Sequence, residues 1–215
     1  MTPMFILIAL FVVFAVLIGA VAFGALIWVV ISYGQRRHRE YVARLVDFAR
    51  KAGLEFRPAT GSWFTRRAAH VAGAYRDRPV LLDSYTVSNG KSSTTYQRMT
   101  VGPADLRGLD LKLGSENFLT RIFQTFGGSD VKIGDPRFDD GLFVRSDTPG
   151  RAREILGEGP LREKLAAVVQ DARGGVRTEA GALKWTAAGT GHSPELLLLV
   201  ADTLCDLADA AESGS

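Results

Sequence analysis

The chain divides sharply into an apolar N-terminal segment and a longer segment in which polar and apolar residues alternate. Residues 5–31 are apolar or glycine without a break, and residues 1–34 contain no charged residue and no histidine. As a helix rising about 1.5 Å per residue, residues 5–31 would be roughly 40 Å long, which exceeds the ~30 Å hydrocarbon core of a bilayer. The pattern predicts a transmembrane anchor over residues 1–34.

A cleavable signal peptide and a buried soluble helix are the two alternatives to this anchor. The tripeptide Ala20-Val21-Ala22 is typical of a signal-peptidase site, but no Lys or Arg precedes the apolar run, which continues to Ile31. A helix of a soluble protein would keep a polar face. The sequence therefore favours an uncleaved single-pass anchor.

Residues at the C-terminal end of the anchor predict its contacts with the bilayer and its orientation. Trp28 and Tyr33 lie where amphipathic rings favour the membrane interface, and Arg36, Arg37 and Arg39 follow directly. We expect these five side chains to contact the membrane interface and the lipid headgroups. Because no basic residue precedes the span, the positive-inside rule places residues 35–215 in the cytoplasm.

Small residues recur within the anchor at helical spacing. Ala15 and Gly19 form one small-xxx-small pattern, and Ala20 and Gly24 form another. Small side chains let two helices approach closely in lipid, so these four residues are candidates for a helix-packing surface in a homo- or hetero-oligomer. The simpler interpretation is that Ala and Gly are common in any such helix.

The segment after the anchor, residues 35–58, predicts a juxtamembrane amphipathic helix and a connector. Tyr41, Leu45, Phe48 and Ala52 recur on one helical face, and Gly53 is a natural stop. The basic residues of this helix would suit an anionic lipid surface. The preferred interpretation is a helix that packs on its own domain.

Residues 59–215 predict an α+β domain in which an antiparallel sheet is covered by helices. Short apolar runs with turn residues between them indicate strands, and apolar residues at helical spacing with Ser, Thr, Asp or Pro before them indicate helices. The predicted strands are 68–75, 80–87, 92–101, 109–113, 142–145 and a hairpin over 176–186, and the predicted helices follow Ser115, Thr148, Gly159 and Ser193.

The tripeptide Gly90-Lys91-Ser92 matches the end of a Walker A phosphate-binding loop, but its context is wrong. The first glycine of that motif would fall at position 85, which is Tyr85, and a strand rather than a helix follows. Asn89-Gly90 is instead a strong signal for a two-residue hairpin turn, because a type I′ turn needs positive φ at both central positions. We therefore expect a long hairpin with a polar tip and no nucleotide binding.

The charge of the chain bears on its possible partners, and its cysteine content bears on disulfide formation. The chain has 26 basic and 23 acidic residues, a net charge of +3 and a pI near 9.2. This mild excess is not the clustered basic surface of a nucleic-acid-binding protein, so we expect no nucleic-acid partner. The single cysteine, Cys205, cannot form an internal disulfide and is expected to be a buried apolar residue.

The residue inventory predicts neither a catalytic site nor a metal or cofactor site. No H-E-x-x-H, C-x-x-C or G-x-S-x-G motif occurs. The best local candidate places His192 beside Ser193, but Ser193 is explained by helix capping. The acidic loop from Asp135 to Asp140 lacks the ligand spacing of a calcium loop.

The segment Gly134-Asp135-Pro136-Arg137-Phe138-Asp139, followed by residues 143–149 and a helix pair that includes residues 161–165, resembles a family of bacterial membrane-anchored domains of unknown function. The shared features are a G-D-P-x-F-D stretch, a strand and an S-D-x-P helix start, over about a third of the chain. The resemblance implies a bacterial source, and hence the inner membrane, and no catalytic residues.

The sequence thus predicts a non-catalytic, membrane-tethered interaction or scaffolding module whose first partner is the lipid bilayer. Two other functions stay open. One is a membrane-bound hydrolase that uses His192 and the Asp135–Asp140 loop. The other is an anionic-lipid sensor that uses residues 36–51.

Overall fold

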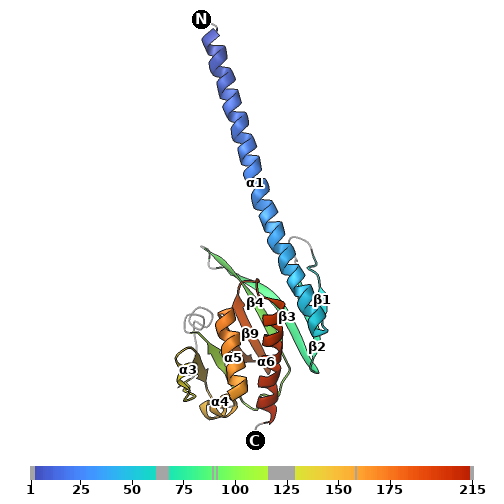
Figure 1. Ribbon diagram of the computed structural model, residues 1–215, viewed down its shortest axis with the longest axis vertical. Coiled ribbons are helices and arrows are strands. Elements are labelled where there is room, and N and C mark those ends of the chain that lie inside the picture. The colour runs from blue at the N-terminus through green and yellow to red at the C-terminus, as the bar shows by residue number, and fades with distance from the viewer. Residues whose placement is uncertain are drawn as a thin grey trace. The chain divides into compact units, whose positions relative to one another are not determined.

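The computed structural model divides into two compact units, Met1–Val42 and Ala43–Ser215 (Figure 1). It describes residues 3–61, 68–88, 90, 92–115, 129–157 and 159–213, and the side chains of these residues except for 3–17, 136 and 137. The first unit is helical throughout its described residues, and the second combines one sheet with several helices.

Helix α1 (Pro3–Ala52) carries both the apolar segment and the basic segment without interruption. By length and composition it is the one helix among the described residues that could cross a membrane, over Ile18–Ala52. The helix predicted for residues 36–52 is therefore the continuation of the apolar helix rather than a separate element. It ends at Gly53, which has a φ of +68°, and the Leu54 N–H donates to the Ala49 carbonyl at 2.8 Å.

The second unit contains a nine-stranded sheet in which every neighbouring pair is antiparallel. The strands are β1 (Glu55–Arg57), β2 (His70–Tyr75), β3 (Arg78–Ser88), β4 (Ser93–Val101), β5 (Lys112–Gly114), β6 (Ser129–Asp130), β7 (Phe143–Ser146), β8 (Gly174–Glu179) and β9 (Ala182–Ala188). Their order in space is β1-β2-β3-β4-β9-β8-β5-β7-β6. The N-terminal hairpins therefore meet the C-terminal hairpin at the β4–β9 pair.

Besides the end of α1, the described helices of this unit are α3 (Pro136–Asp139), α4 (Pro149–Leu156), α5 (Gly159–Ala172) and α6 (Pro194–Ser213). Helices α5 and α6 lie side by side against the central strands (Figure 1), with α6 contacting β4 and β9 and α5 contacting β8. The predicted α+β class, with an antiparallel sheet covered by helices after an N-terminal apolar helix, is confirmed.

The core lies between the sheet and these helices. Side chains alternate along a strand, so residues paired across strands share a face. Met99 pairs with Trp185, which pairs with Val176, and all three are fully buried. Leu165 of α5 and Leu204 of α6 are also fully buried. The sequence periodicity predicted these apolar positions because each lies on the inward face of its own element.

Two hairpin turns of two residues each join strands that the sequence predicted. Ala180 and Gly181 join β8 to β9 with φ of +52° and +70°, the backbone of a type I′ turn. Arg76 and Asp77 join β2 to β3 with φ of +50° and +61°. Left-handed backbone at Arg76 is unusual for a residue with a long side chain, so its turn needs support from elsewhere in the fold.

Of three further predicted elements, one is confirmed with a longer loop, one is shorter than expected, and one lies outside the described residues. The hairpin between β3 and β4 is confirmed, but its last pair is Ser88 and Ser93, so four residues connect the strands rather than the two of a tight Asn-Gly turn. The strand expected over residues 109–113 is shorter and begins only at Lys112. The helix expected after Ser115 lies outside the described residues.

The helix starts of the C-terminal half follow their sequence signals in part. Ser193 precedes α6 and its Oγ accepts a hydrogen bond from the Leu196 N–H at 3.2 Å, as predicted for an N-cap with proline at the first helical position. Thr148 stands at the corresponding position of α4, but its hydroxyl makes no cap hydrogen bond. It accepts instead from the Asp110 N–H at 3.3 Å.

Candidate interaction surface

Basic side chains form one row across the polar face of the sheet. Lys184, Arg177, Lys112 and Arg145 are consecutive partners in register on β9, β8, β5 and β7. Like charges opposite one another destabilise a sheet unless acids separate them. Glu179 does so here, because its carboxylate accepts from Lys184 at 2.9 Å and from Arg177 at 2.6 Å.

The remaining members of the row, Lys112 and Arg145, also have acidic neighbours. Lys112 lies 3.3 Å from Asp110, and Asp130 stands opposite Arg145 in the register. On the adjacent pair of strands, Arg98 donates to Asp83 through Nε at 3.0 Å and through Nη2 at 2.5 Å. Acidic residues therefore neighbour the basic row and reduce the repulsion between its members.

The hairpin arm, which we define as residues 83–88 and 93–95, extends past the rest of the sheet (Figure 1). On one side, β2 pairs with β3 only as far as Leu82. On the other side, β9 pairs with β4 only from Tyr96 onward. Among the described strands, none continues alongside the arm, although the Gly189 N–H still donates to the Thr95 carbonyl at 2.8 Å.

Aromatic and charged side chains fix the base of the hairpin arm. The rings of Tyr85 and Tyr96 stack with their centroids 5.6 Å apart, and the Arg98 guanidinium lies 5.2 Å from the centroid of Tyr85. Burial raises the pKa of Tyr85, which therefore stays neutral at physiological pH. Toward the tip, Thr86 and Thr95 face each other with their hydroxyls 2.9 Å apart, and Val87 is 51% exposed. The arm thus has several side-chain contacts at its base and is exposed at its end.

Gly90 at the tip of the arm has a φ of +81°, and a Cβ added there would meet no atom within 4 Å. We expect Gly90→Val to lower the free energy of unfolding by roughly 1–2 kcal/mol, because a β-branched residue resists positive φ even where space is available. Lys91→Ala should change it by less than about 0.5 kcal/mol. Thermal unfolding with and without Mg-nucleotide measures both. Stabilisation of the wild type by nucleotide, lost in Lys91→Ala, would restore the phosphate-loop interpretation.

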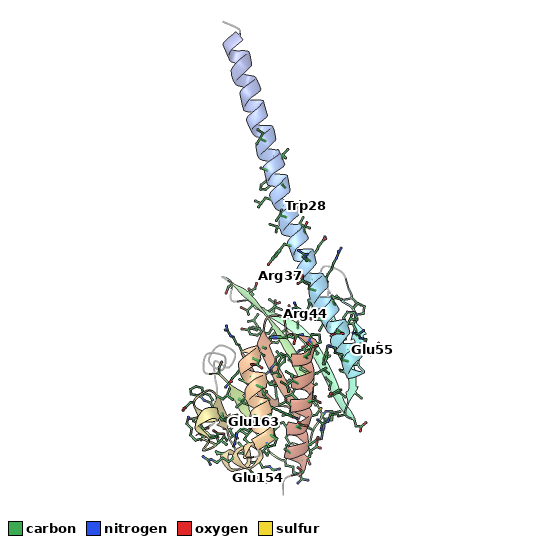
Figure 2. The ribbon with its side chains drawn as sticks, in the orientation of Figure 1. Trp28, Arg37, Arg44, Glu55, Glu154 and Glu163 are labelled. Carbon is green, nitrogen blue, oxygen red and sulfur yellow. The ribbon has the colours of Figure 1, made fainter. Side chains whose placement is uncertain are left out.

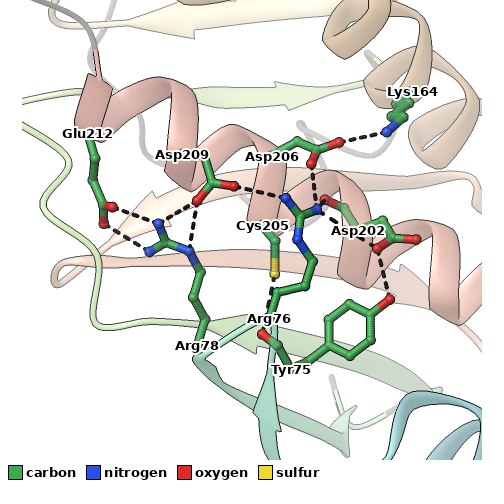
Figure 3. A network of polar contacts seen from close by, with 9 residues as sticks. All are labelled: Tyr75, Arg76, Arg78, Lys164, Asp202, Cys205, Asp206, Asp209 and Glu212. Carbon is green, nitrogen blue, oxygen red and sulfur yellow. Dashed lines mark hydrogen bonds and ion pairs between the residues drawn. The ribbon is translucent and has the colours of Figure 1, made fainter.

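A second cluster, which we call the clasp, joins the β2–β3 turn to α6 (Figure 3). Arg76 donates to Asp206 at 2.6 Å and to Asp209 at 2.9 Å. Arg78 donates through three nitrogens to Asp209 and Glu212, at 2.6–3.1 Å. The clasp supplies the support that the left-handed backbone of Arg76 needs.

Other side chains extend the clasp on both sides. Lys164 of α5 donates to Asp206 at 2.7 Å, and the Tyr75 hydroxyl donates to Asp202 at 2.8 Å. Burial, together with the neighbouring Asp202, raises the pKa of Tyr75 to about 12. The acids of α6 recur every three or four residues and so lie on one helical face. The spacing of these acids is a sequence signal for the clasp. The pattern of apolar residues does not contain that signal.

The clasp should make stability depend on acid pH. Hydrogen bonds from Arg78 hold the pKa of Glu212 below its ordinary value of 4.5. For Asp206, hydrogen bonds from Lys164 and Arg76 outweigh the effect of burial, which alone would raise the pKa, and the pKa is again lowered. A lowered carboxyl pKa adds stability that is complete above the unfolded-state pKa and is lost as the pH falls through the folded-state pKa.

We therefore expect Arg78→Ala to cost about 1–2 kcal/mol at neutral pH, since the buried stem of the side chain contributes packing as well as charge. The difference from wild type should shrink as the pH falls below about 4. Urea unfolding of the full chain at several pH values measures it. The matched control is Arg153→Ala, an exposed arginine outside the clasp. A cost for Arg78→Ala that is constant down to pH 3 would contradict the ion-pair explanation.

His192 lies in the loop before α6, with its ring edge against Trp185 and the ring centroids 5.3 Å apart. Burial lowers the pKa of His192, and the nearby charge of Arg44 acts in the same direction. Arg44 itself donates to the Gly191 carbonyl at 2.8 Å. This histidine is thus held neutral within the packing of the domain.

Two acidic residues of the Asp135–Asp140 loop have partners within the domain, and Cys205 is buried in it. Asp139 accepts from the backbone N–H groups of Ile133 and Gly134, and Asp135 pairs with Arg162 of α5 at 3.0 Å. Among the described residues, no cluster of histidine, cysteine and acidic side chains could hold a metal ion. Cys205 is buried as predicted, and burial raises its pKa to about 11, so its thiol is unreactive at neutral pH.

The side chains predicted to contact the membrane are exposed on α1 (Figure 2). Trp28 is 71% exposed and Tyr33 is 59% exposed, and the Arg37 guanidinium lies 5.0 Å from the centroid of the Tyr33 ring. Arg36 and Arg39 are exposed as well.

The residues proposed for helix packing lie along the same helix. Gly19, Ala20 and Gly24 are exposed, whereas the side chain of Ala15 is outside the described part. A Cβ added at Gly19 or Gly24 would meet no atom within 4 Å.

Comparisons of the chain with protein-family models, with curated proteins and with solved structures found no match.

Proposed function

We propose that the protein is a non-catalytic interaction module tethered to the cell inner membrane by a single span, with residues 35–215 in the cytoplasm. The exposed apolar surface of α1 supports the tether, because residues 18–31 would otherwise face water. The orientation is supported by Arg36, Arg37 and Arg39, which follow the span, and by the absence of any basic residue before it in the sequence.

The observation that carries the interaction role is the hairpin arm. A sheet edge that continues beyond its neighbouring strands offers N–H and C=O groups to another extended chain, and many interaction domains bind in this way. The stacked Tyr85 and Tyr96 rings and the Asp83–Arg98 pair hold the arm in one conformation at its base. A preorganised arm loses less conformational entropy when it binds a partner than a flexible loop does.

The two other functions considered from the sequence receive less support. A hydrolase would need His192 and the Asp135–Asp140 loop at one centre, but Asp135 and Asp139 have structural partners and His192 packs on Trp185. Lipid contact by the arginines after the span follows from anchoring itself, so a separate lipid-sensing role is not needed to explain them.

The interaction role is tested by photo-crosslinking in native membranes with the full chain. A benzoyl-phenylalanine replaces Val87 on the arm, and in a matched control it replaces Leu81. Leu81 lies on the same strand and face and is also exposed, but it precedes the arm. We expect one discrete adduct from position 87 and little from position 81. Absence of an adduct at position 87, or equal labelling at both positions, would contradict the proposed function.

A further inference from the structure

The last turns of α1 are attached to the second unit at the loop that precedes α6. Three apolar side chains of this part of the helix are buried in the unit: Leu45, Phe48 and Ala49. Beside them, Arg44 donates to the Gly191 carbonyl at 2.8 Å. About two turns further along the helix, Lys51 donates to Glu195 of α6 at 2.5 Å. The polar contacts of this attachment therefore converge on residues 191–195.

His192 lies between these two contact points in the sequence and connects the loop to the centre of the sheet. Its ring packs at 72° to the indole of Trp185, which is fully buried in β9. The Nε2 atom of His192 is buried and has no hydrogen-bond partner among the described residues. In the charged ring both nitrogens carry a proton, so Nε2 would become a buried donor without an acceptor. The site of the ring therefore suits its neutral form.

Burial is the main reason why His192 resists protonation. It lowers the pKa of the ring below its ordinary value of 6.5, and the charge of Arg44 acts in the same direction. The backbone of Ala188 acts in the opposite direction but does not outweigh them. Because the pKa is lower in the packed state, the packing of the ring contributes stability that is complete above about pH 6.5. That stability is lost as the pH falls from there through the lowered pKa.

The acidic groups on the neighbouring helices do not titrate in the same range. Asp47 of α1 and Glu195 at the start of α6 both pair with Lys51, which lowers the pKa of each carboxyl below its ordinary value. On β9, Lys184 precedes Trp185 and so points to the opposite face of the sheet. Neither carboxylate changes its charge near pH 6, so a change in this region near pH 6 would belong to the histidine.

We propose that His192 is an acid-sensitive latch that holds residues 43–52 of α1 on the domain. When the ring takes up a proton, its position against Trp185 becomes unfavourable. The loop then moves out together with the Gly191 carbonyl, so the hydrogen bond from Arg44 is lost and the apolar face of this part of α1 is released. The clasp stays closed in this pH range, because its carboxylates have lowered pKa values.

Hydrogen exchange of the full chain in detergent, between pH 5.5 and 7.5, tests the latch. Release that is linked to the uptake of one proton raises the opening equilibrium by up to about tenfold for each pH unit below 6.5. We expect the amide protection of residues 43–52 and 188–196, corrected for the intrinsic exchange rate, to fall about three- to tenfold from pH 6.5 to 5.5. The protection of residues 160–172 in α5 should stay constant.

Two variants assign the effect to His192. His192→Phe keeps a ring against Trp185 and removes the titrating group, so the protection of both segments should no longer depend on pH. His192→Gln is neutral and polar, and it should give the same flat profile if phenylalanine disturbs the packing. The matched control combines His38→Gln with His70→Gln, which removes the other two of the three histidines in the chain. It should keep the pH dependence of the wild type.

Arg44→Ala tests the connection between the loop and α1. At pH 7.5 it should lower the protection of residues 43–52 about two- to tenfold, the effect of losing one hydrogen bond. It should also reduce the fall between pH 6.5 and 5.5, because the charge of Arg44 helps to lower the pKa of His192. A role in packing alone would leave the size of that fall unchanged.

The outcomes are distinct. A fall in the protection of both segments that is absent from the His192 variants supports the latch. Protection of residues 43–52 that is independent of pH in the wild type would overturn it, as would an equal fall in the wild type and in both His192 variants. A fall confined to residues 188–196 would show that the loop opens without releasing α1, and it would overturn the latch as well.

Discussion

Trp185→Ala is expected to lower the free energy of unfolding by about 3–5 kcal/mol, the largest effect of any single substitution considered for the domain. Trp185 is the largest fully buried side chain among the described residues and lies between Met99 and Val176 in the centre of the sheet. Its removal leaves a cavity that the paired strands cannot close, since their backbones are fixed by hydrogen bonds. Urea unfolding of the full chain in detergent, followed by circular dichroism, measures the loss.

Two controls make this prediction specific to packing. Trp28→Ala removes the same side chain from an exposed position on α1 and should leave the unfolding of the domain within about 0.5 kcal/mol of wild type. Trp185→Phe keeps most of the volume. It also removes the indole N–H, which has no hydrogen-bond partner among the described residues, so it should cost clearly less than Trp185→Ala. Equal losses for the two Trp185 variants would show that volume is not what the site requires.

Reversal of the basic cluster after the span is expected to produce the largest change in behaviour, a change of membrane topology. In wild type, protease added to intact spheroplasts should leave the domain of residues 43–215 undigested. In the proposed orientation the positive charge of Arg36, Arg37 and Arg39 holds this end in the cytoplasm. Their replacement by Glu removes that charge, so a fraction of the chains should become accessible to protease. Immunoblotting for the C-terminus after protease treatment measures that fraction.

The matched control for topology is Arg153→Glu, which changes charge far from the span in sequence and should leave the domain protected. Digestion of the wild-type domain in intact spheroplasts would overturn the proposed orientation. It would leave the fold and the hairpin arm as they are, because neither depends on the side of the membrane.

Local sequence signals were enough to predict many of the elements of the fold. The turn at Ala180-Gly181, the cap at Ser193 and the stop at Gly53 each depend on the φ preference or hydrogen bonding of one or two neighbouring residues. The inward faces of β3, β4 and α6 follow from a period of two or 3.6 residues. These features could be predicted because their physical causes act over fewer than about ten residues.

The features that involve distant residues could not be predicted in the same way. The row from Lys184 to Arg145 exists only because β9, β8, β5 and β7 are neighbours, and no local pattern encodes that order. The Arg76 turn adopts left-handed backbone that its own sequence disfavours, because α6 holds it from more than a hundred residues away. Likewise, the extent of the hairpin arm depends on where the pairing of β2 and β9 ends.

The order of strands in the sheet has a consequence for the way the protein is made. The apolar part of α1 is synthesised before the β2–β3 and β3–β4 hairpins, and β9 and α6 are synthesised after them. Because β4 pairs with β9 and α6 carries the acids of the clasp, both hairpins must wait for the final third of the chain before the core can close. Such long-range pairing is slow to form and leaves strands exposed meanwhile. If the proposed anchor inserts while the chain is still growing, the unpaired hairpins would spend this interval beside the membrane before their partners are synthesised.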